Sequence, residues 1–295
     1  MASSLSECLF QQVTIIGVGL LGGSLGLVLK EQGLAKTIVG IGRRQVNLEL
    51  AVQVGAIDRF TSEAHEAVRD SDLIVLATPV DTYVSHVQRW GQHVPSGAIV
   101  SDVGSVKGQL VFDVEAALPS TACFVGAHPI AGKEKSGVAH ATSKLFDGAR
   151  CIVTPTPHTN ADALAKIRCL WEKAGSTVLS MDPMVHDWVL GAVSHLPHIA
   201  AFSLMHALQD LQEKTPEALS LLDFSGGGLR DTTRIAASSP EMWRDICLAN
   251  RENLLIMVEQ YITQLQAFKQ LLNDQDGSGL SQNIEQAKML RERLS

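Results

Sequence analysis

The sequence predicts an α/β domain followed by an all-helical domain, and three observations support this prediction. In the first half of the 295 residues, short apolar runs alternate with helix-like stretches. Eight of the 24 glycines lie between residues 13 and 42. Beyond residue 183 helical patterns dominate, and no convincing strand follows. With 45% apolar and 19% charged residues, the chain is neither disordered nor fibrous and is long enough to bury a sizeable core.

Seven apolar runs in the first half are predicted as strands. They are expected at residues 13–16, 37–41, 73–76, 98–102, 123–127, 151–154 and 177–179. Helix-like segments between them include residues 21–31, 47–54 and 161–174. Short, largely apolar strands that alternate with amphipathic helices are typical of a sheet covered on both faces.

The second half is predicted to be helical throughout. Helices are expected at residues 184–211, 217–223, 242–272 and 282–293. The change of pattern falls near residues 180–183, which predicts one domain over residues 1–183 and a second over residues 184–295.

Charge and cysteine content exclude several classes of protein. Lys and Arg number 24 against 31 Asp and Glu, and a net charge of −7 gives no general attraction to nucleic acid or to anionic membranes. The five cysteines are scattered and form no CxxC pair, which indicates a reduced, cytoplasmic protein without a disulfide framework. No signal peptide is evident, and the uncharged stretch at residues 13–29 is too short and too rich in glycine for a membrane span.

A glycine motif directly follows the first predicted strand. Gly17, Gly19 and Gly22 form the pattern GxGxxG, with Leu20 and Leu21 between them at the start of a predicted helix. In dinucleotide-binding folds these glycines permit a tight turn, close approach of a pyrophosphate and close packing of helix on strand. The helix N-terminus supplies N–H donors to the phosphates. Because strand, motif, helix and second strand occur in order, we predict an NAD(P)-binding loop; a glycine-rich packing contact is the alternative.

The end of the second predicted strand bears on the choice of cofactor. An Asp or Glu at this point binds the ribose 2′-hydroxyl of NAD, but the sequence has Arg43 and Arg44 after Gly42. No carboxylate is present there to repel a 2′-phosphate, and two guanidinium groups would bind one. The sequence therefore favours NADP over NAD. The alternative is that both arginines lie in a solvated loop and that the enzyme uses NAD or either cofactor.

Polar residues follow three further predicted strands, where the ligand crevice of such a sheet lies. Thr78 and Pro79 come after the strand at 73–76, and either line the nicotinamide side or form an ordinary turn. Ser105 lies in the next loop, and a plain helix N-cap is its simplest interpretation. His128 stands at the end of the strand at 123–127, before a proline, and is a candidate general base, although a lone histidine is more often structural.

The helical half carries two polar clusters. His195 and His198 lie about one helical turn apart on one face, beside Pro197, and no Asp, Glu or Cys at ligand spacing completes a metal site. Arg230 and Arg234 lie four residues apart after a run of glycines and form a candidate carboxylate clamp; a network of Arg and Asp at a helix start is the alternative. Trp243 either walls the same pocket or fills the core.

Five motifs occur together and in order, and they resemble one family over essentially the whole chain. They are Gly17-x-Gly19-Leu-x-Gly22-Gly-Ser24, Asp102-Val-Gly-Ser105-Val-Lys107, His128-Pro-Ile-Ala-Gly132-x-Glu134-x-Ser136-Gly137, Ser194-His195-Leu-Pro-His198 and Arg230-Asp-Thr-Thr-Arg234. This set resembles the prephenate/arogenate (cyclohexadienyl) dehydrogenase family of tyrosine biosynthesis, in its monofunctional form. The resemblance implies a Rossmann-type domain followed by a helical dimerisation domain, a homodimer, and oxidative decarboxylation of a small cyclohexadienyl substrate.

The resemblance also implies roles for three residues in the reaction. His128 resembles the histidine that deprotonates the ring hydroxyl, which suits a neutral imidazole. Ser105 resembles the serine that orients that hydroxyl and the histidine. Arg234 matches the arginine that holds the side-chain carboxylate.

Further positions match the substrate pocket of the family. His198, and with it His195, resemble the pocket histidines of the helical domain. Arg230, Asp231 and Glu134 resemble a charged network near the pocket mouth. The family often has an acid at the end of the second strand, so the sequence here leaves NAD or NADP open, and it also leaves prephenate or arogenate open.

Two other functions are weighed against this one. A 3-hydroxyacid or imine-type dehydrogenase has a similar two-domain layout, but the hydroxyacid enzymes carry a catalytic lysine on the first long helix of the helical domain, and residues 184–211 contain no lysine. A non-catalytic NADP sensor needs neither a base at His128 nor a clamp at Arg234.

Overall fold

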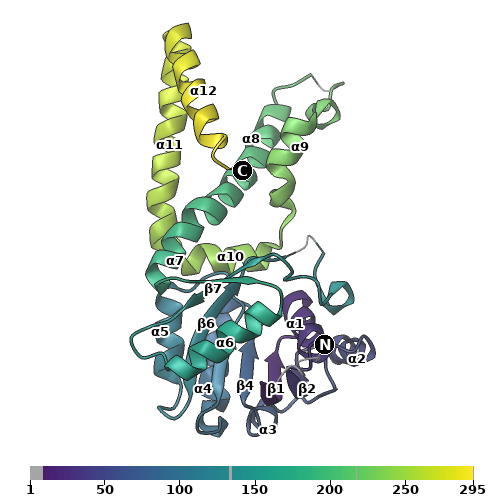
Figure 1. Cartoon of the computed structure of the whole chain (residues 1–295). Coiled ribbons are helices and arrows are strands. Elements are labelled where there is room, and N and C mark those ends of the chain that lie inside the picture. The colour runs from purple at the N-terminus through teal and green to yellow at the C-terminus, as the bar shows by residue number, and fades with distance from the viewer. Residues whose placement is uncertain (1–8, 133–134, 217, 295) are drawn as a thin grey trace, which may run out of the picture.

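The computed structural model describes residues 9–132, 135–216 and 218–294 and contains one eight-stranded sheet (Figure 1). The strand order is β3-β2-β1-β4-β5-β6-β7-β8. All neighbouring pairs are parallel except β6 and β7. The strands are β1 (Phe10–Ile16), β2 (Ala35–Ile41), β3 (Arg59–Phe60), β4 (Leu73–Leu76), β5 (Ile99–Asp102), β6 (Cys123–Pro129), β7 (Arg150–Thr154) and β8 (Thr177–Ser180).

Each of the seven predicted strands is present, and no end differs from the prediction by more than three residues. The strand that the sequence prediction missed is β3, which is two residues long and pairs with β2 at the edge of the sheet. Such a short run carries no hydrophobic period to detect. β6 extends past the predicted end because residues 126–129 pair with β7, so His128 lies within the strand.

The sheet is buried on both faces. Along β1 and β4, alternate residues enter different apolar clusters: Ile15 and Val75 pack on one face, and Ile16 and Ile74 on the other. Residues of α1 (Leu20–Glu31), α2 (Gln45–Gln53) and α6 (Ala161–Lys173) belong to the first cluster. Residues of α3 (Ala64–Val68), α4 (Tyr83–Trp90) and α5 (Gly108–Ala117) belong to the second. This confirms the predicted α/β layer structure.

After β8 the described chain contains helices and turns but no strand, as predicted. The helices are α7 (Pro183–Leu190), a π-helical turn (Gly191–His195), α8 (Leu196–Gln212), α9 (Gly227–Thr233), α10 (Pro240–Ala249), α11 (Arg251–Asn273) and α12 (Gly277–Arg291). In Figure 1, α8 with α9 and α11 with α12 form two arms that diverge away from the sheet. α10 lies at the base of the arms and contacts the loop that follows β4.

Three predicted helices differ from the structure. The helix expected at 242–272 is divided at Asn250, where α10 ends and α11 begins. The helix expected at 217–223 is wrong: residue 217 lies outside the described residues, and the chain beyond it forms a turn and a 3₁₀ turn (Leu221–Phe224) without any buried residue. A segment this short does not recover the cost of helix nucleation without core contacts. α12 begins five residues before the predicted start, where Asp276 accepts a hydrogen bond from the Gly279 N–H.

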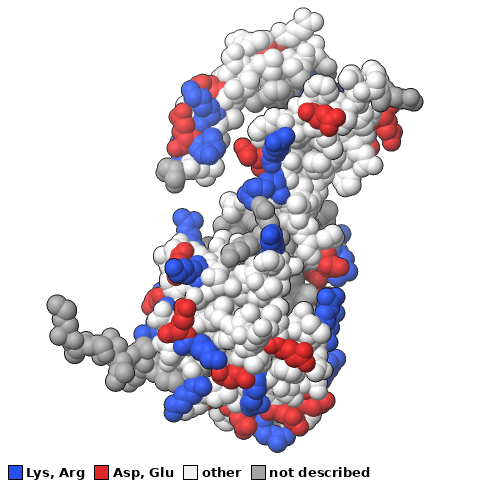
Figure 2. Space-filling view, turned by 90° about the vertical axis from the view of Figure 1, so that its right-hand side faces the viewer, with Lys and Arg blue, Asp and Glu red and all other residues white. Residues whose placement is uncertain are grey.

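The two arms expose many large apolar side chains, and much of the face of the helical half that Figure 2 shows carries no Lys, Arg, Asp or Glu. Among the described residues, the continuous helical segment from Pro183 to Gln212 is the one that is long and apolar enough to cross a membrane. Of its most apolar 18-residue stretch, 22% is buried. Other exposed apolar residues on the arms are Leu255, Ile256, Ile262, Leu265, Phe268, Leu272, Ile284, Met289 and Leu290.

Candidate functional site

The glycine loop lies at the carboxyl end of β1, where the chain reverses its direction across the sheet between β2 and β4. Gly17 has φ +99°, and a Cβ there would lie 2.5 Å from the carbonyl oxygen of Ala77. A Cβ at Gly22 would lie 2.3 Å from the carbonyl oxygen of Gly17. Both positions therefore need glycine for the fold itself.

Gly19 differs, because a Cβ at this position would meet nothing within 4 Å. The space beside it is the space that a pyrophosphate needs. α1 begins directly after Gly19, with neither a side-chain cap nor an acidic residue in its first turn, so its N-terminal N–H groups suit an anion. Leu20 and Leu21 form that first turn and are half-buried. The loop therefore fits a dinucleotide.

The ends of β2 and β4 flank this loop. The N–H of Gly17 donates to the carbonyl of Ile41, the last residue of β2. Arg43 and Arg44 follow and are exposed, with Arg44 at the N-cap of α2. On the other side the methyl group of Thr78 would lie 2.9 Å from a Cβ at Gly17. Pro79 is the exposed N-cap of the 3₁₀ turn η1 (Val80–Thr82). The structure thus brings these predicted residues to the glycine loop.

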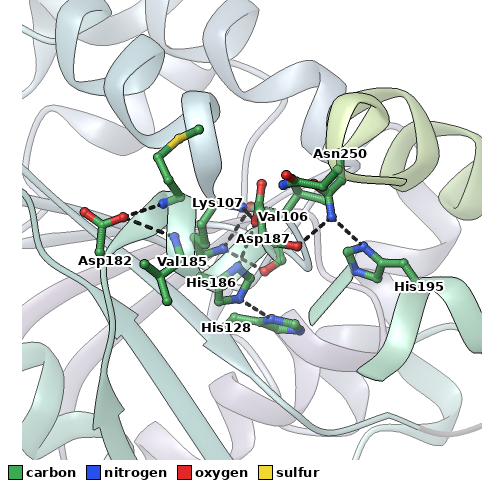
Figure 3. Close-up of polar contacts among 12 residues, drawn as sticks. Val106, Lys107, His128, Asp182, Val185, His186, Asp187, His195 and Asn250 are labelled. Carbon is green, nitrogen blue, oxygen red and sulfur yellow. Dashed lines mark hydrogen bonds and ion pairs between the residues drawn. The ribbon is translucent and has the colours of Figure 1, made fainter. Parts of the chain in front are cut away.

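His128 lies on β6 at the same carboxyl edge of the sheet and is linked to two residues of α7 (Figure 3). Its Nδ1 is 2.9 Å from Nε2 of His186. Nδ1 of His186 is 2.8 Å from Oδ1 of Asp187, and the same oxygen accepts the backbone N–H of Lys107 over 2.8 Å. All of these side chains are buried.

A buried ion pair lies beneath His128. Nζ of Lys107 is 2.7 Å from Oδ2 of Asp102, and both side chains are 1% exposed. Lys107 also donates to the carbonyl of Gly104, and Asp102 accepts the backbone N–H groups of Gly104 and Ala127. Burial lowers the pKa of His128 well below its ordinary value, and the charge of Lys107 and the nearby His186 and His195 lower it further. His128 is therefore neutral at pH 7 and ready to accept a proton.

Two histidines of the helical half, His195 and His198, meet at Trp243. The ring of His198 stacks on the indole with centroids 3.7 Å apart, and the ring of His195 meets it edge-on at 5.8 Å. Trp243 is buried against Val106 and Phe202, so it packs in a small core as well as beside both histidines. Burial lowers the pKa of His195 to about 4, and burial together with the charge of Arg234 lowers the pKa of His198. Arg234 therefore lies near His198.

The remaining predicted residues have different surroundings. Ser105 is half-buried in the loop between β5 and α5, but it is not the helix N-cap, because Lys107 occupies that position. Arg230 is exposed on α9, a helix without a buried residue. Glu134 lies outside the described residues. Within the described chain, no group of three or more His, Cys, Asp or Glu side chains is arranged to hold a metal ion.

The sequence prediction missed three residues of this site. His186 and Asp187 are adjacent polar residues in an otherwise apolar helical stretch, and that contrast was their one signal. Asn250 gave no signal at all. Its Nδ2 donates to the carbonyl of Asp187 over 2.8 Å and lies 3.0 Å from Nδ1 of His195, so it joins the start of α11 to the site (Figure 3).

Comparison with known proteins identifies the family. The family "Prephenate dehydrogenase, nucleotide-binding domain" matches residues 25–180, and "Prephenate dehydrogenase, dimerization domain" matches residues 182–286. A prephenate dehydrogenase of Bacillus subtilis is 34% identical over 283 residues, 96% of this chain and 76% of that protein. This chain belongs to the prephenate dehydrogenase family. It is therefore an oxidoreductase with an NAD(P)-binding domain.

Solved structures of the family share the whole fold. A prephenate dehydrogenase from A. aeolicus, in complex with hydroxyphenyl propionate and NAD+, is 36% identical with a TM-score of 0.89, covering 97% of this chain and 98% of that chain. An arogenate dehydrogenase from Synechocystis is 27% identical with a TM-score of 0.82, covering 97% of this chain and all of the other.

Proposed function

We propose that this chain oxidises and decarboxylates prephenate, arogenate or both, with NAD(P) as hydride acceptor. The observation that carries this proposal is the neutral, buried imidazole of His128, which lies at the same edge of the sheet as the dinucleotide loop. When bound, the oxidised nicotinamide supplies the acceptor for the hydride. His128 accepts the proton of the ring hydroxyl, and Ser105 orients both groups. The ring carboxylate then leaves as CO2 while the ring becomes aromatic.

The helical half is proposed to hold the substrate. Arg234 binds the side-chain carboxylate as a bidentate guanidinium partner. His198 and His195, which both contact Trp243, are proposed to face the substrate. The buried Nε1 of Trp243 lacks a hydrogen-bond partner in the described structure. Arg230 is proposed to belong to a charged network at the pocket mouth; Glu134, which the resemblance also assigns to it, lies outside the described residues. Residues 1–183 thus bind cofactor, and residues 184–295 bind substrate and the second subunit.

For the cofactor, we propose a preference for NADP over NAD. Support comes from Arg43 and Arg44, which are exposed directly after β2 where an NAD-specific loop has a carboxylate. The A. aeolicus relative was solved with NAD+, so the support for NADP comes from the loop residues of this chain alone. A higher kcat/KM with NAD than with NADP would contradict it.

We also propose a soluble homodimer that forms through the arms. The family's second domain is described as a dimerization domain, and the exposed apolar residues of α8, α11 and α12 form the kind of surface that a second subunit covers. Sedimentation equilibrium is expected to give twice the 31.7 kDa chain mass.

One experiment tests the main function. The purified protein is incubated with each combination of NAD or NADP and prephenate or arogenate, and reduced cofactor is followed by its absorbance. Formation of the reduced cofactor with the expected phenolic product in at least one combination supports the proposal. No signal in any of the four combinations would refute it.

A further inference from the structure

His128 is the first member of a buried chain of three side chains. His186, which is 0% exposed, bridges Nδ1 of His128 and Oδ1 of Asp187, at 2.9 Å and 2.8 Å. The rings of the two histidines meet edge-on, with centroids 5.1 Å apart. Figure 3 shows the dashed contacts among these side chains, and α7 supplies both His186 and Asp187.

The donor and the acceptor of each of these hydrogen bonds follow from the contacts of Asp187. Oδ1 of Asp187 accepts the backbone N–H of Lys107, at the start of α5. The positive end of the α5 dipole favours a charged carboxylate there. A carboxylate only accepts, so Nδ1 of His186 must donate to it. A neutral imidazole carries one N–H, which leaves a lone pair on Nε2 of His186.

The protonation state of His128 follows from that of His186. Burial lowers the pKa of both His128 and His186, so both rings are neutral at pH 7. The lone pair on Nε2 of His186 requires that Nδ1 of His128 carries the proton and donates. Nε2 of His128 is then left with its lone pair, as the one nitrogen of that ring able to accept a proton.

We propose that His186 and Asp187 are positioning residues that hold His128 in its Nδ1–H tautomer and so select Nε2 as the base. This inference rests on the proposed function. In the reaction the O–H bond of the ring hydroxyl breaks and an N–H bond forms on Nε2 of His128. The resulting imidazolium then donates a charge-assisted hydrogen bond to His186, and the negative charge of Asp187 stabilises it.

Other titratable groups also lie around His128 and set the background for this effect. They are Asp102 on β5, Lys107 at the N-cap of α5, Cys151 on β7 and His195 on the π-helical turn. Lys107 and His195 disfavour the imidazolium. Asp187 opposes them through His186, and its removal is expected to make protonation of His128 harder.

The tautomer itself is the first test, and it needs no substrate. In the whole protein labelled with 15N-histidine, two-bond 1H–15N couplings distinguish a ring protonated at Nδ1 from one protonated at Nε2. His128→Asn identifies the signals of His128 by their loss. We expect Nδ1 protonated and Nε2 unprotonated at pH 7. Protonation of His128 at Nε2 would overturn the inference, whether or not the protein oxidises prephenate or arogenate.

The second test changes His186 in two ways. His186→Leu removes the acceptor and is expected to lower kcat by about 10- to 100-fold with little change in KM, as for loss of a supporting residue. His186→Gln keeps an oxygen near the Nε2 position that accepts from His128 and is expected to recover most of that loss. If both variants keep the full kcat, or if leucine and glutamine lower it equally, the positioning role is wrong.

The third test distinguishes an electrostatic effect of Asp187 on His128 from simple capping of α5. Asp187→Asn keeps an oxygen that accepts the N–H groups of Lys107 and His186, but removes the charge. We expect the acidic limb of the kcat/KM profile to move to lower pH. Asp182→Asn is the matched control and should leave the limb in place, because it alters only the side chain that caps Met184 and Val185 and keeps the backbone carbonyl that accepts the His186 N–H. If the acidic limb of the kcat/KM profile does not move in Asp187→Asn, the role of Asp187 is merely structural.

Discussion

The backbone N–H of Lys107 donates to Oδ1 of Asp187 over 2.8 Å, although the two residues are 80 positions apart. Lys107 ends the loop between β5 and α5, and Asp187 belongs to the first helix after the sheet. This bond therefore joins the cofactor-binding half to the helical half at the point where His128 is held. The proposed chemistry therefore depends on both halves.

His128→Asn is expected to lower turnover by roughly 10²–10⁴-fold, because a positioned general base contributes that much. Affinity for the nicotinamide cofactor should change little, since the glycine loop lies on other strands. Steady-state kinetics and cofactor titration measure the two effects. A fall in turnover of less than about tenfold would contradict the role of His128 as base.

Arg234→Gln is expected to weaken substrate binding by about 1.5–3 kcal/mol, the contribution of a hydrogen bond to a charged group. Turnover at saturating substrate should fall much less. Arg89→Gln, on the exposed surface of α4, is the matched control and should leave KM unchanged. Equal KM values for wild type and Arg234→Gln would contradict the proposal that Arg234 binds the substrate carboxylate.

The glycine loop allows one substitution that separates folding from binding. Gly19→Ala should change the free energy of unfolding by less than about 0.5 kcal/mol, because the new Cβ meets open space. It should weaken cofactor binding at least about tenfold, or 1.4 kcal/mol, because that space is where the pyrophosphate is expected. Gly22→Ala should instead destabilise the fold by about 1–3 kcal/mol, since its Cβ would overlap the Gly17 carbonyl. Normal cofactor affinity in Gly19→Ala would place the pyrophosphate elsewhere.

Lys107→Met is expected to reduce the free energy of unfolding by about 3–5 kcal/mol, because it leaves the carboxylate of Asp102 buried without its cation. The double variant Lys107→Met with Asp102→Asn removes the uncompensated charge and keeps acceptors for the backbone, so it should lose less. Urea denaturation measures both. The pairing is unimportant for stability if the double variant is as destabilised as the single one.

Acid should destabilise the protein through His195. Burial lowers its pKa to about 4, whereas the unfolded chain keeps an ordinary value near 6.5. The unfolded state therefore binds more protons between these values, and stability falls as pH falls from about 6.5 through about 4, by about 3 kcal/mol for this residue. His195→Gln should flatten the dependence of the unfolding free energy on pH, while His158→Gln, at an exposed site, should not. Equal slopes for all three proteins would refute this.

Much of the fold was predictable because local and global preferences agree. The strands at residues 73–76 and 99–102 are buried on both faces, so they are short apolar runs that a single sequence reveals. The glycines at 17 and 22 are needed by backbone contacts that any such loop makes. β3 and the break at Asn250 were not predictable, because the first is two residues long and the second depends on bonds to Asp187 and His195.

The order of the two halves, the glycine loop and the identity of the candidate base were predictable, because they depend on periodicity and on motifs within single segments. The surroundings of that base follow from the tertiary fold alone. Lys107, His186 and Asp187 are distributed over 81 residues and meet His128 because parallel strands end at one edge of the sheet and α7 folds back over it. Burial and charge at that meeting point make the imidazole neutral, and no local pattern records them.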